Sequence, residues 1–128
     1  MLHVSVVAFG VALLKKLSAR LPTAHRPIAR VMAFLVLTVG VLIVAHTIQI
    51  WMWAAVFIAI ADLPDLSTSF YFSTVTYTTL GYGDIVLGPG SRIVATFCAV
   101  TGLLTFGIST ALLISVLSRV LPDLFKQE

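Results

Sequence analysis

Eleven residues near the middle of the chain, TVTYTTLGYGD from Thr74 to Asp84, combine hydroxyl groups, two alternate glycines and a carboxylate. Glycine adopts left-handed backbone conformations as readily as right-handed ones, so Gly81 and Gly83 allow successive peptides to alternate in hand. Consecutive carbonyl groups can then all point the same way. Four such segments around one axis would stack rings of oxygens that can replace the water shell of a cation, with the Thr79 hydroxyl at the inner end.

The rest of the chain has the composition of a membrane protein. Its 128 residues are 59% hydrophobic and 10% charged, and its mean hydropathy is +1.09. A spanning helix needs about 20 apolar residues, and two segments qualify, residues 31–61 and 92–121. A third segment, residues 1–14, is apolar but short. Lys15 and Lys16 could lengthen it by snorkelling, so it is either a marginal spanning helix or an interfacial one.

The residues between the two spans predict a helix that enters the membrane without crossing it. Pro64 disfavours helix at the residue before it, and Asp65 or Ser67 can cap a new helix. The expected helix, residues 67–78, is too short to span. It would aim the partially negative end of its dipole at the centre of the ring, which favours a cation there.

These elements define the expected fold class, an all-α membrane protein. An outer helix is followed by a re-entrant helix, an irregular glycine-containing segment, a Gly- and Pro-containing loop and an inner helix, with or without an extra N-terminal membrane helix. Irregular backbone at membrane depth must be buried in protein or line a watery path. The expected parts are residues 1–30 as an N-terminal apolar helix and basic segment, 31–121 as the membrane domain, and 122–128 as a short tail.

Charge predicts the orientation. Basic residues lie before the first long span and after the last, which places both flanks in the cytoplasm: Lys15, Lys16, Arg20, Arg26, Arg30, Arg119 and Lys126. The net charge of +3 therefore indicates topology and contact with anionic lipid heads rather than nucleic acid. Cys98 is the only cysteine, so no disulfide or metal framework is expected, and its thiol should be buried among apolar side chains.

TTLGYGD closely resembles the signature of potassium channels. Together with RIVATFCAVTGLLT, residues 92–105, the longer stretch TVTYTTLGYGD is similar to the pore module of voltage-gated potassium channels. The resemblance covers about the last two thirds of the chain. One chain supplies only one segment of the ring, so a homotetramer is expected, with four copies lining one passive pathway for K⁺. From the small size of the chain, the expected location is a plasma or inner membrane.

The resemblance also implies the roles of individual residues. Carbonyl groups of the selectivity filter would coordinate K⁺, Gly83 would close the filter and Asp84 would sit at the outer mouth. The implied ligands are the carbonyls of Thr79, Leu80, Gly81 and Tyr82, with the Thr79 hydroxyl.

Two glycines of the inner helix carry implied roles in gating. Gly102 matches the hinge glycine of the family. Gly107 is a second candidate flexible point, although close helix packing with Ala111 and Ser115 explains it equally well.

The chain departs from the family pattern at several positions. Leu80 replaces the commoner valine. Tyr71 and Phe72 stand where two tryptophans are usual, so Phe72 cannot donate a hydrogen bond to Asp84, and Val75 removes another partner of that carboxylate. The proline pair of the inner helix is replaced by Ser109, Thr110 and Ala111.

Polar and aromatic residues of the first long span allow two interpretations each. His46 and Gln49 lie one turn apart, and a neutral His46 bonded across a helix interface, for example to a hydroxyl, is the preferred interpretation. Proton sensing is the alternative. Trp51, Trp53 and Tyr71 would form an aromatic belt at the outer interface, or simply pack against lipid.

The predicted function is a potassium-selective channel. The alternatives are a weakly selective monovalent cation channel and a non-conducting membrane subunit that needs partners. Enzymatic activity is not expected, because no nucleophile and base pair is evident. No cofactor and no soluble partner are expected, with membrane lipid and copies of the same chain as the contacts. A helix with arginine at every third residue, typical of voltage sensors, is not evident.

Overall fold

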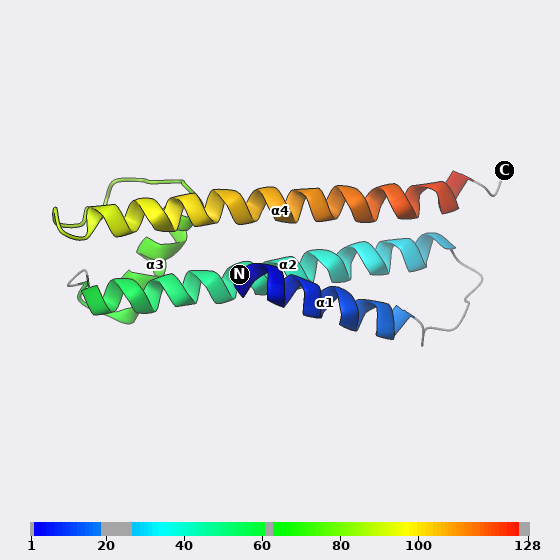
Figure 1. The fold of residues 1–128 in the computed structure, drawn as a ribbon, viewed down its shortest axis with the longest axis horizontal. Coiled ribbons are helices and arrows are strands. Elements are labelled where there is room, and N and C mark those ends of the chain that lie inside the picture. Colours follow the sequence, from blue (N-terminus) through cyan, green and yellow to red (C-terminus); the bar gives the residue numbers. More distant parts are fainter. Residues whose placement is uncertain (1, 19–26, 61–62, 126–128) are drawn as a thin grey trace. The chain divides into compact units, whose positions relative to one another are not determined.

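The computed structural model describes residues 2–18, 27–60 and 63–125, and every regular element within them is a helix (Figure 1). The four helices are α1 (Leu2–Ser18), α2 (Pro27–Ile60), α3 (Leu66–Tyr77) and α4 (Arg92–Phe125). Two segments, Val31–Ile60 of α2 and Arg92–Ser118 of α4, are long and apolar enough to cross a membrane. The short α3 lies between them in the chain, so the expected all-α membrane fold is confirmed.

The helices extend somewhat beyond the predicted limits. α2 begins at Pro27 rather than at residue 31, and proline suits the first position of a helix because its missing N–H is not needed there. α4 continues to Phe125 rather than ending at residue 121. The apolar part of α1, His3–Ala12, is shorter than either candidate span. Three residues of the predicted basic flanks, Arg20, Arg26 and Lys126, fall outside the described residues. The side chains of three others, Lys15, Arg30 and Arg119, are not described.

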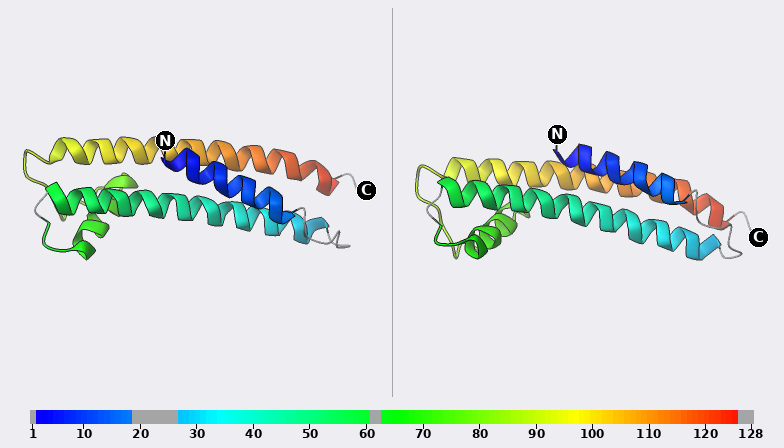
Figure 2. Two further views of the ribbon diagram at one scale, coloured as in Figure 1. Left: turned by 60° about the horizontal axis from the view of Figure 1, so that its bottom comes forward. Right: turned by 90° about the horizontal axis from the view of Figure 1, so that it is seen from below.

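The chain forms two compact units, and α2 and α4 each contribute to both. The first unit comprises residues 1–45 and 108–128, of which the described part contains α1 (Figure 2). Val7 of α1 packs with Leu42 and Ala45 of α2. A buried His3 Nε2 lies 3.0 Å from the Ser109 hydroxyl of α4. Aliphatic packing and this polar contact therefore join α1 to the two long helices within the unit.

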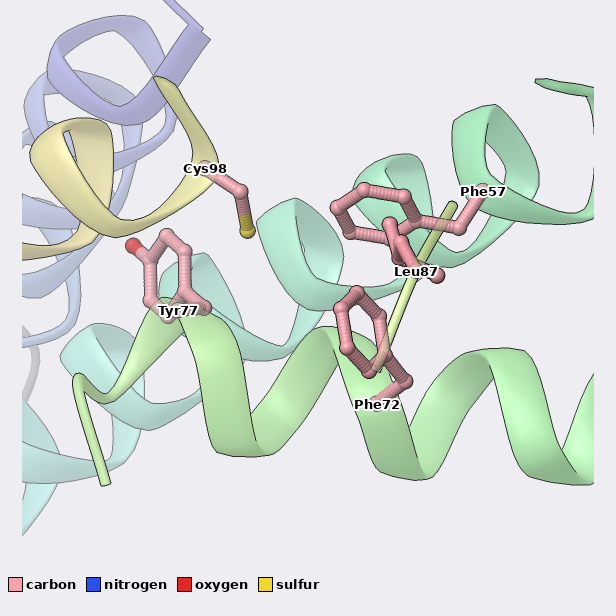
Figure 3. Packing of buried hydrophobic residues seen from close by; sticks show 5 residues of the cluster. All are labelled: Phe57, Phe72, Tyr77, Leu87 and Cys98. Atoms are coloured by element: carbon pink, nitrogen blue, oxygen red, sulfur yellow. The ribbon is translucent and has the colours of Figure 1, made fainter. Parts of the chain in front are cut away.

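The second unit comprises residues 46–107. Its core contains five buried side chains contributed by α2, α3, α4 and the loop between α3 and α4, namely Phe57, Phe72, Tyr77, Leu87 and Cys98 (Figure 3). Phe57 and Phe72 meet edge to face, with ring centroids 4.9 Å apart. The Cys98 thiol is buried and free, as predicted. This core fixes α3 against both long helices.

The start of α3 follows directly from Pro64 and Asp65. Asp65 has an extended backbone and is the N-cap, and its carboxylate accepts bonds from Thr68 N at 2.8 Å and Thr68 Oγ1 at 2.9 Å. These bonds lower the pKa of the Asp65 carboxyl, because they favour its charged form. The helix of 12 residues ends at Tyr77, with Thr78 as the C-cap. It is about 18 Å long, well short of a hydrocarbon core of about 30 Å.

Candidate functional site

The segment of residues 79–83, which follows α3, has a backbone that alternates in hand. Thr79, Gly81 and Gly83 have positive φ angles of 60°, 56° and 77°. Leu80 and Tyr82, which lie between them, have negative φ angles. The alternate glycines predicted this pattern at two positions. Thr79 extends it by one step, although a β-branched residue rarely adopts a left-handed conformation.

Backbone N–H groups of the 79–83 segment bond back to the last turns of α3. Thr79 N donates to Thr76 O at 3.0 Å, and Leu80 N and Gly81 N both donate to Val75 O, at 2.9 and 3.2 Å. Within the described part of the chain, no protein donor bonds to the carbonyl oxygens of residues 79–83. The segment is also exposed over its whole length. The amides of residues 79–81 are therefore engaged, and the carbonyls of residues 79–83 are available to a ligand.

The outer end of this segment is held by a residue whose role the sequence did not reveal. Tyr71 Oη of α3 donates a hydrogen bond of 2.6 Å to Asp84 Oδ2. From the sequence, Phe72 cannot donate to Asp84, and Tyr71 was expected either in an aromatic belt at the outer interface or packed against lipid. The hydrogen bond to Asp84 raises the pKa of the exposed Tyr71 phenol, because it stabilises the neutral form.

The inner end of the segment is held by Tyr77, the last residue of α3. Tyr77 is completely buried, and Figure 3 shows it at the end of the α3 ribbon, on the side of Cys98. Its hydroxyl lies 2.9 Å from His46 Nδ1 of α2 and 2.6 Å from Thr105 Oγ1 of α4. The predicted bond between His46 and a hydroxyl is thus confirmed. His46 also stacks on Phe106, with ring centroids 4.2 Å apart.

Further hydrogen bonds connect the helices of this unit. Ser73 Oγ of α3 donates to Ile50 O of α2 at 2.7 Å. Trp53 Nε1 of α2 donates to Thr101 Oγ1 of α4 at 3.1 Å. The Trp53 indole thus links α2 to α4. Trp51 is exposed and packs on Phe70, with ring centroids 4.5 Å apart.

The two glycines of α4 have different surroundings. Gly102 is buried, and a Cβ added there would collide with the backbone carbonyl of Tyr77. Gly102 therefore permits α4 to approach the end of α3 closely. Gly107 is exposed, with open space where a Cβ would stand. The boundary between the two compact units falls directly after Gly107 in the chain.

The ligands that residues 79–83 offer are carbonyl oxygens and the Thr79 hydroxyl. Among the residues that the structure describes, no group of three or more His, Cys, Asp or Glu side chains is arranged to hold a metal ion. Neutral oxygens are the ligands that potassium filters use in place of water. The geometry of the 79–83 segment thus suits a permeating monovalent cation, which would be the cargo of the protein and not a resident cofactor.

Comparison with known proteins defines the class. A family model described as ion channel matches residues 45–119. This range covers the second unit, with its candidate site, and continues along α4. The chain belongs to this ion channel family, and it is therefore a membrane protein with a channel pore domain and not an enzyme.

The curated relatives indicate a particular kind of pore. The chain is 37% identical over 68 residues to potassium voltage-gated channel subfamily A member 10 of Mus musculus and of Homo sapiens, a match that covers 48% of this chain and 13% of each relative. Member 2 of the same subfamily from Xenopus laevis is also 37% identical over 68 residues, covering 48% of this chain and 14% of the relative. No solved structure is a significant match. The pore domain thus resembles that of potassium channels.

Proposed function

We propose that the chain forms a potassium-selective channel in which four copies line one pore. K⁺ would pass through the filter segment, residues 79–83, without coupling to another energy source. Carbonyl oxygens offset the loss of the ion's water shell, and repulsion between neighbouring ions keeps each site from holding its ion.

The alternating backbone of the filter segment is the observation that carries this proposal. Positive φ angles at Thr79, Gly81 and Gly83 alternate with the other hand at Leu80 and Tyr82. Carbonyl groups that accept no protein donor among the described residues remain available to an ion. The proposed ligands are the carbonyls of Thr79, Leu80, Gly81 and Tyr82, with the Thr79 hydroxyl, while Gly83 closes the filter.

A homotetramer is proposed because one chain supplies one segment of the ring. The face of α4 available for packing with other copies is apolar and exposed in the single chain. Its exposed side chains include Ile93, Phe97, Val100, Leu103 and Leu104. In the assembly this surface would contact neighbouring copies, the pore or lipid.

The proposed roles outside the filter concern its mouth and the inner helix. Asp84 would lie at the outer mouth, where its carboxylate attracts cations. Gly102 and Gly107 would be the points at which the inner helix changes its course during gating. The proposed membrane is the plasma membrane or a bacterial inner membrane, with both charged flanks on the cytoplasmic side.

A second candidate function is a weakly selective monovalent cation channel. Leu80 supports it, because this position carries valine in the commoner filter sequence. A non-conducting subunit remains the third alternative, and conduction by the purified chain alone would exclude it.

Flux from lipid vesicles tests the proposal. Vesicles that contain the purified full chain and are loaded with K⁺ should release it rapidly, whereas vesicles loaded with Na⁺ should not. Equal release of the two ions would support the weakly selective alternative. Chemical cross-linking in the same vesicles should give species up to a tetramer, and a limit at the dimer would contradict the proposed assembly.

A further inference from the structure

Tyr77 is bonded to both long helices at the point where α3 ends. The side chain is completely buried. Its hydroxyl lies 2.9 Å from His46 Nδ1 on α2 and 2.6 Å from Thr105 Oγ1 on α4. One side chain thus joins three helices immediately before the filter segment.

The neighbours of Thr105 assign a direction to these hydrogen bonds. Thr105 Oγ1 lies 2.8 Å from Thr101 O and 3.0 Å from Gly102 O, and a carbonyl can only accept. The single Thr105 hydroxyl proton therefore points to its own helix, so Tyr77 O–H donates to Thr105 Oγ1. The Tyr77 oxygen can then accept from His46 Nδ1–H. This gives a chain of donors from α2 through α3 to α4, with the histidine proton assigned to Nδ1 from the network.

Backbone packing also fixes the position of the end of α3 against α4. The Tyr77 carbonyl and ring occupy the space that a side chain at Gly102 would need. The end of α3 therefore has a defined position against α4 through both its main chain and its side chain. Packed interiors transmit small displacements because they contain few voids.

A displacement of the last turn of α3 would move the backbone of the filter segment, because the two are hydrogen-bonded to each other. Leu80 N and Gly81 N donate to Val75 O, and Thr79 N donates to Thr76 O. Both acceptors lie in the last turn of α3, within two residues of Tyr77. The filter backbone is thus bonded to the same turn that the Tyr77 hydroxyl holds in place.

We infer that His46, Tyr77 and Thr105 form a positioning chain that sets the ion selectivity of the filter segment by fixing the last turn of α3 against α2 and α4. These residues contact no ion and act through the backbone of residues 79–81. The inference rests on the proposed potassium-channel function. It assigns a role in selectivity to three residues outside the filter.

Two matched threonines of α4 provide the test. Thr105→Val removes the hydroxyl that bonds Tyr77 of α3, whereas Thr101→Val removes the hydroxyl that bonds Trp53 of α2. Both substitutions keep a β-branched side chain on the same helix. The measurement is the ratio of K⁺ to Na⁺ permeability of the purified full chain in planar bilayers. We expect a decrease of about two- to tenfold for T105V, the factor that corresponds to one neutral hydrogen bond, and no decrease for T101V.

Three further variants change the other two residues of this set, Tyr77 and His46. Tyr77→Phe removes both bonds while keeping the ring in the core, and it should lower the permeability ratio as T105V does. His46→Asn, which can place an amide N–H near the position of Nδ1, should retain more selectivity than His46→Leu. If selectivity is retained by an N–H donor at position 46 and not by an apolar side chain there, the hydrogen bond to Tyr77 matters, and not only the filling of space.

Each outcome is decisive. A selective wild type with unchanged T105V and Y77F overturns the inference and leaves the proposed function standing. Equal decreases in T105V and T101V also overturn it, because they indicate a general effect of helix contacts. If T105V and Y77F fail to assemble while T101V assembles, the chain of bonds serves folding and the role in selectivity is wrong. A non-selective wild type contradicts the proposed function itself, and the inference with it.

Discussion

The inner and outer ends of the filter segment are held by different kinds of contact. At the inner end, Tyr77 is buried and bonded to two helices, and its carbonyl packs on Gly102. At the outer end, an exposed tyrosine bonds the exposed carboxylate of Asp84. Water competes more strongly for the exposed outer bond than for the part-buried inner ones. We therefore expect the inner end to be fixed by the fold and the outer end to respond to pH and to the solution.

The largest effect should come from the middle of the segment. Gly81→Ala places a side chain at φ +56°, which costs about 1–2 kcal/mol in each copy, in a ring that needs four matching segments. Potassium flux from vesicles should be abolished. Gly88→Ala, in the loop before α4, is the control, because a Cβ there meets open space and flux should be normal. Unchanged flux in G81A would remove the filter assignment.

At the inner end, Gly102→Ala should destabilise the protein. The added methyl group would collide with the Tyr77 carbonyl, and overpacking of this kind typically costs about 1–3 kcal/mol. Thermal unfolding of the detergent-solubilised protein should show a lower midpoint. Gly40→Ala on α2, where nothing lies within 4 Å of an added Cβ, should leave the midpoint unchanged or raise it. An equal midpoint for G102A and wild type would mean that Gly102 acts only as a flexible point.

At the outer end, Tyr71→Phe should have a moderate effect on conduction and little effect on assembly. Loss of the bond to Asp84 should shorten conducting periods in single-channel records by a factor of about two to ten. Thr96→Val is the control, because the exposed Thr96 hydroxyl bonds Ile93 O within its own helix.

The same outer bond predicts a response to alkaline solution. The Tyr71 phenol has a pKa raised above its ordinary value of 10.0. The stabilisation that it provides is complete below pH 10 and is lost as the pH rises through the raised pKa. Wild-type conducting periods should therefore shorten toward those of Y71F at high pH. A wild type whose records do not change over this range would contradict a role for the bond in conduction.

The smallest effect should come from the start of α3, far along the helix from the filter. Asp65→Ala removes the cap and should lower the unfolding midpoint slightly at neutral pH. The pKa of Asp65 is lowered below 3.8, so its contribution is present at neutral pH and is lost as the pH falls through that lowered pKa. Asp65→Asn should keep the cap without the acid dependence. Midpoints of D65A and wild type should therefore converge in acid, and a constant difference would show that the charge is not involved.

The sequence predicted the elements around the filter because their signals are local. Pro64 and Asp65 locate the start of α3 to within one residue, and the alternate glycines indicate the backbone pattern at residues 81 and 83. The positive φ of Thr79 carries no such signal, since a β-branched side chain argues against it. Only the continuation of the alternation by one step could have indicated it.

The partners of the polar residues could not be predicted because they depend on tertiary structure. A hydroxyl partner for His46 was expected, but Tyr77 lies 31 positions away along the chain. Tyr71 and Asp84 are 13 positions apart and meet only because the filter segment runs back past α3. From its position after the first long span, Tyr71 was expected in an aromatic belt or packed against lipid. The available signal for its bond was the presence of a phenol in α3 and a carboxylate just beyond the filter segment.

Reversal potential tests the central claim most directly, namely that residues 79–83 of four copies select K⁺. The purified full chain would be placed in a planar bilayer with potassium solution on one side and sodium solution on the other. We expect a reversal potential close to the potassium limit. A clear current that reverses near zero would contradict it and would identify a weakly selective cation channel.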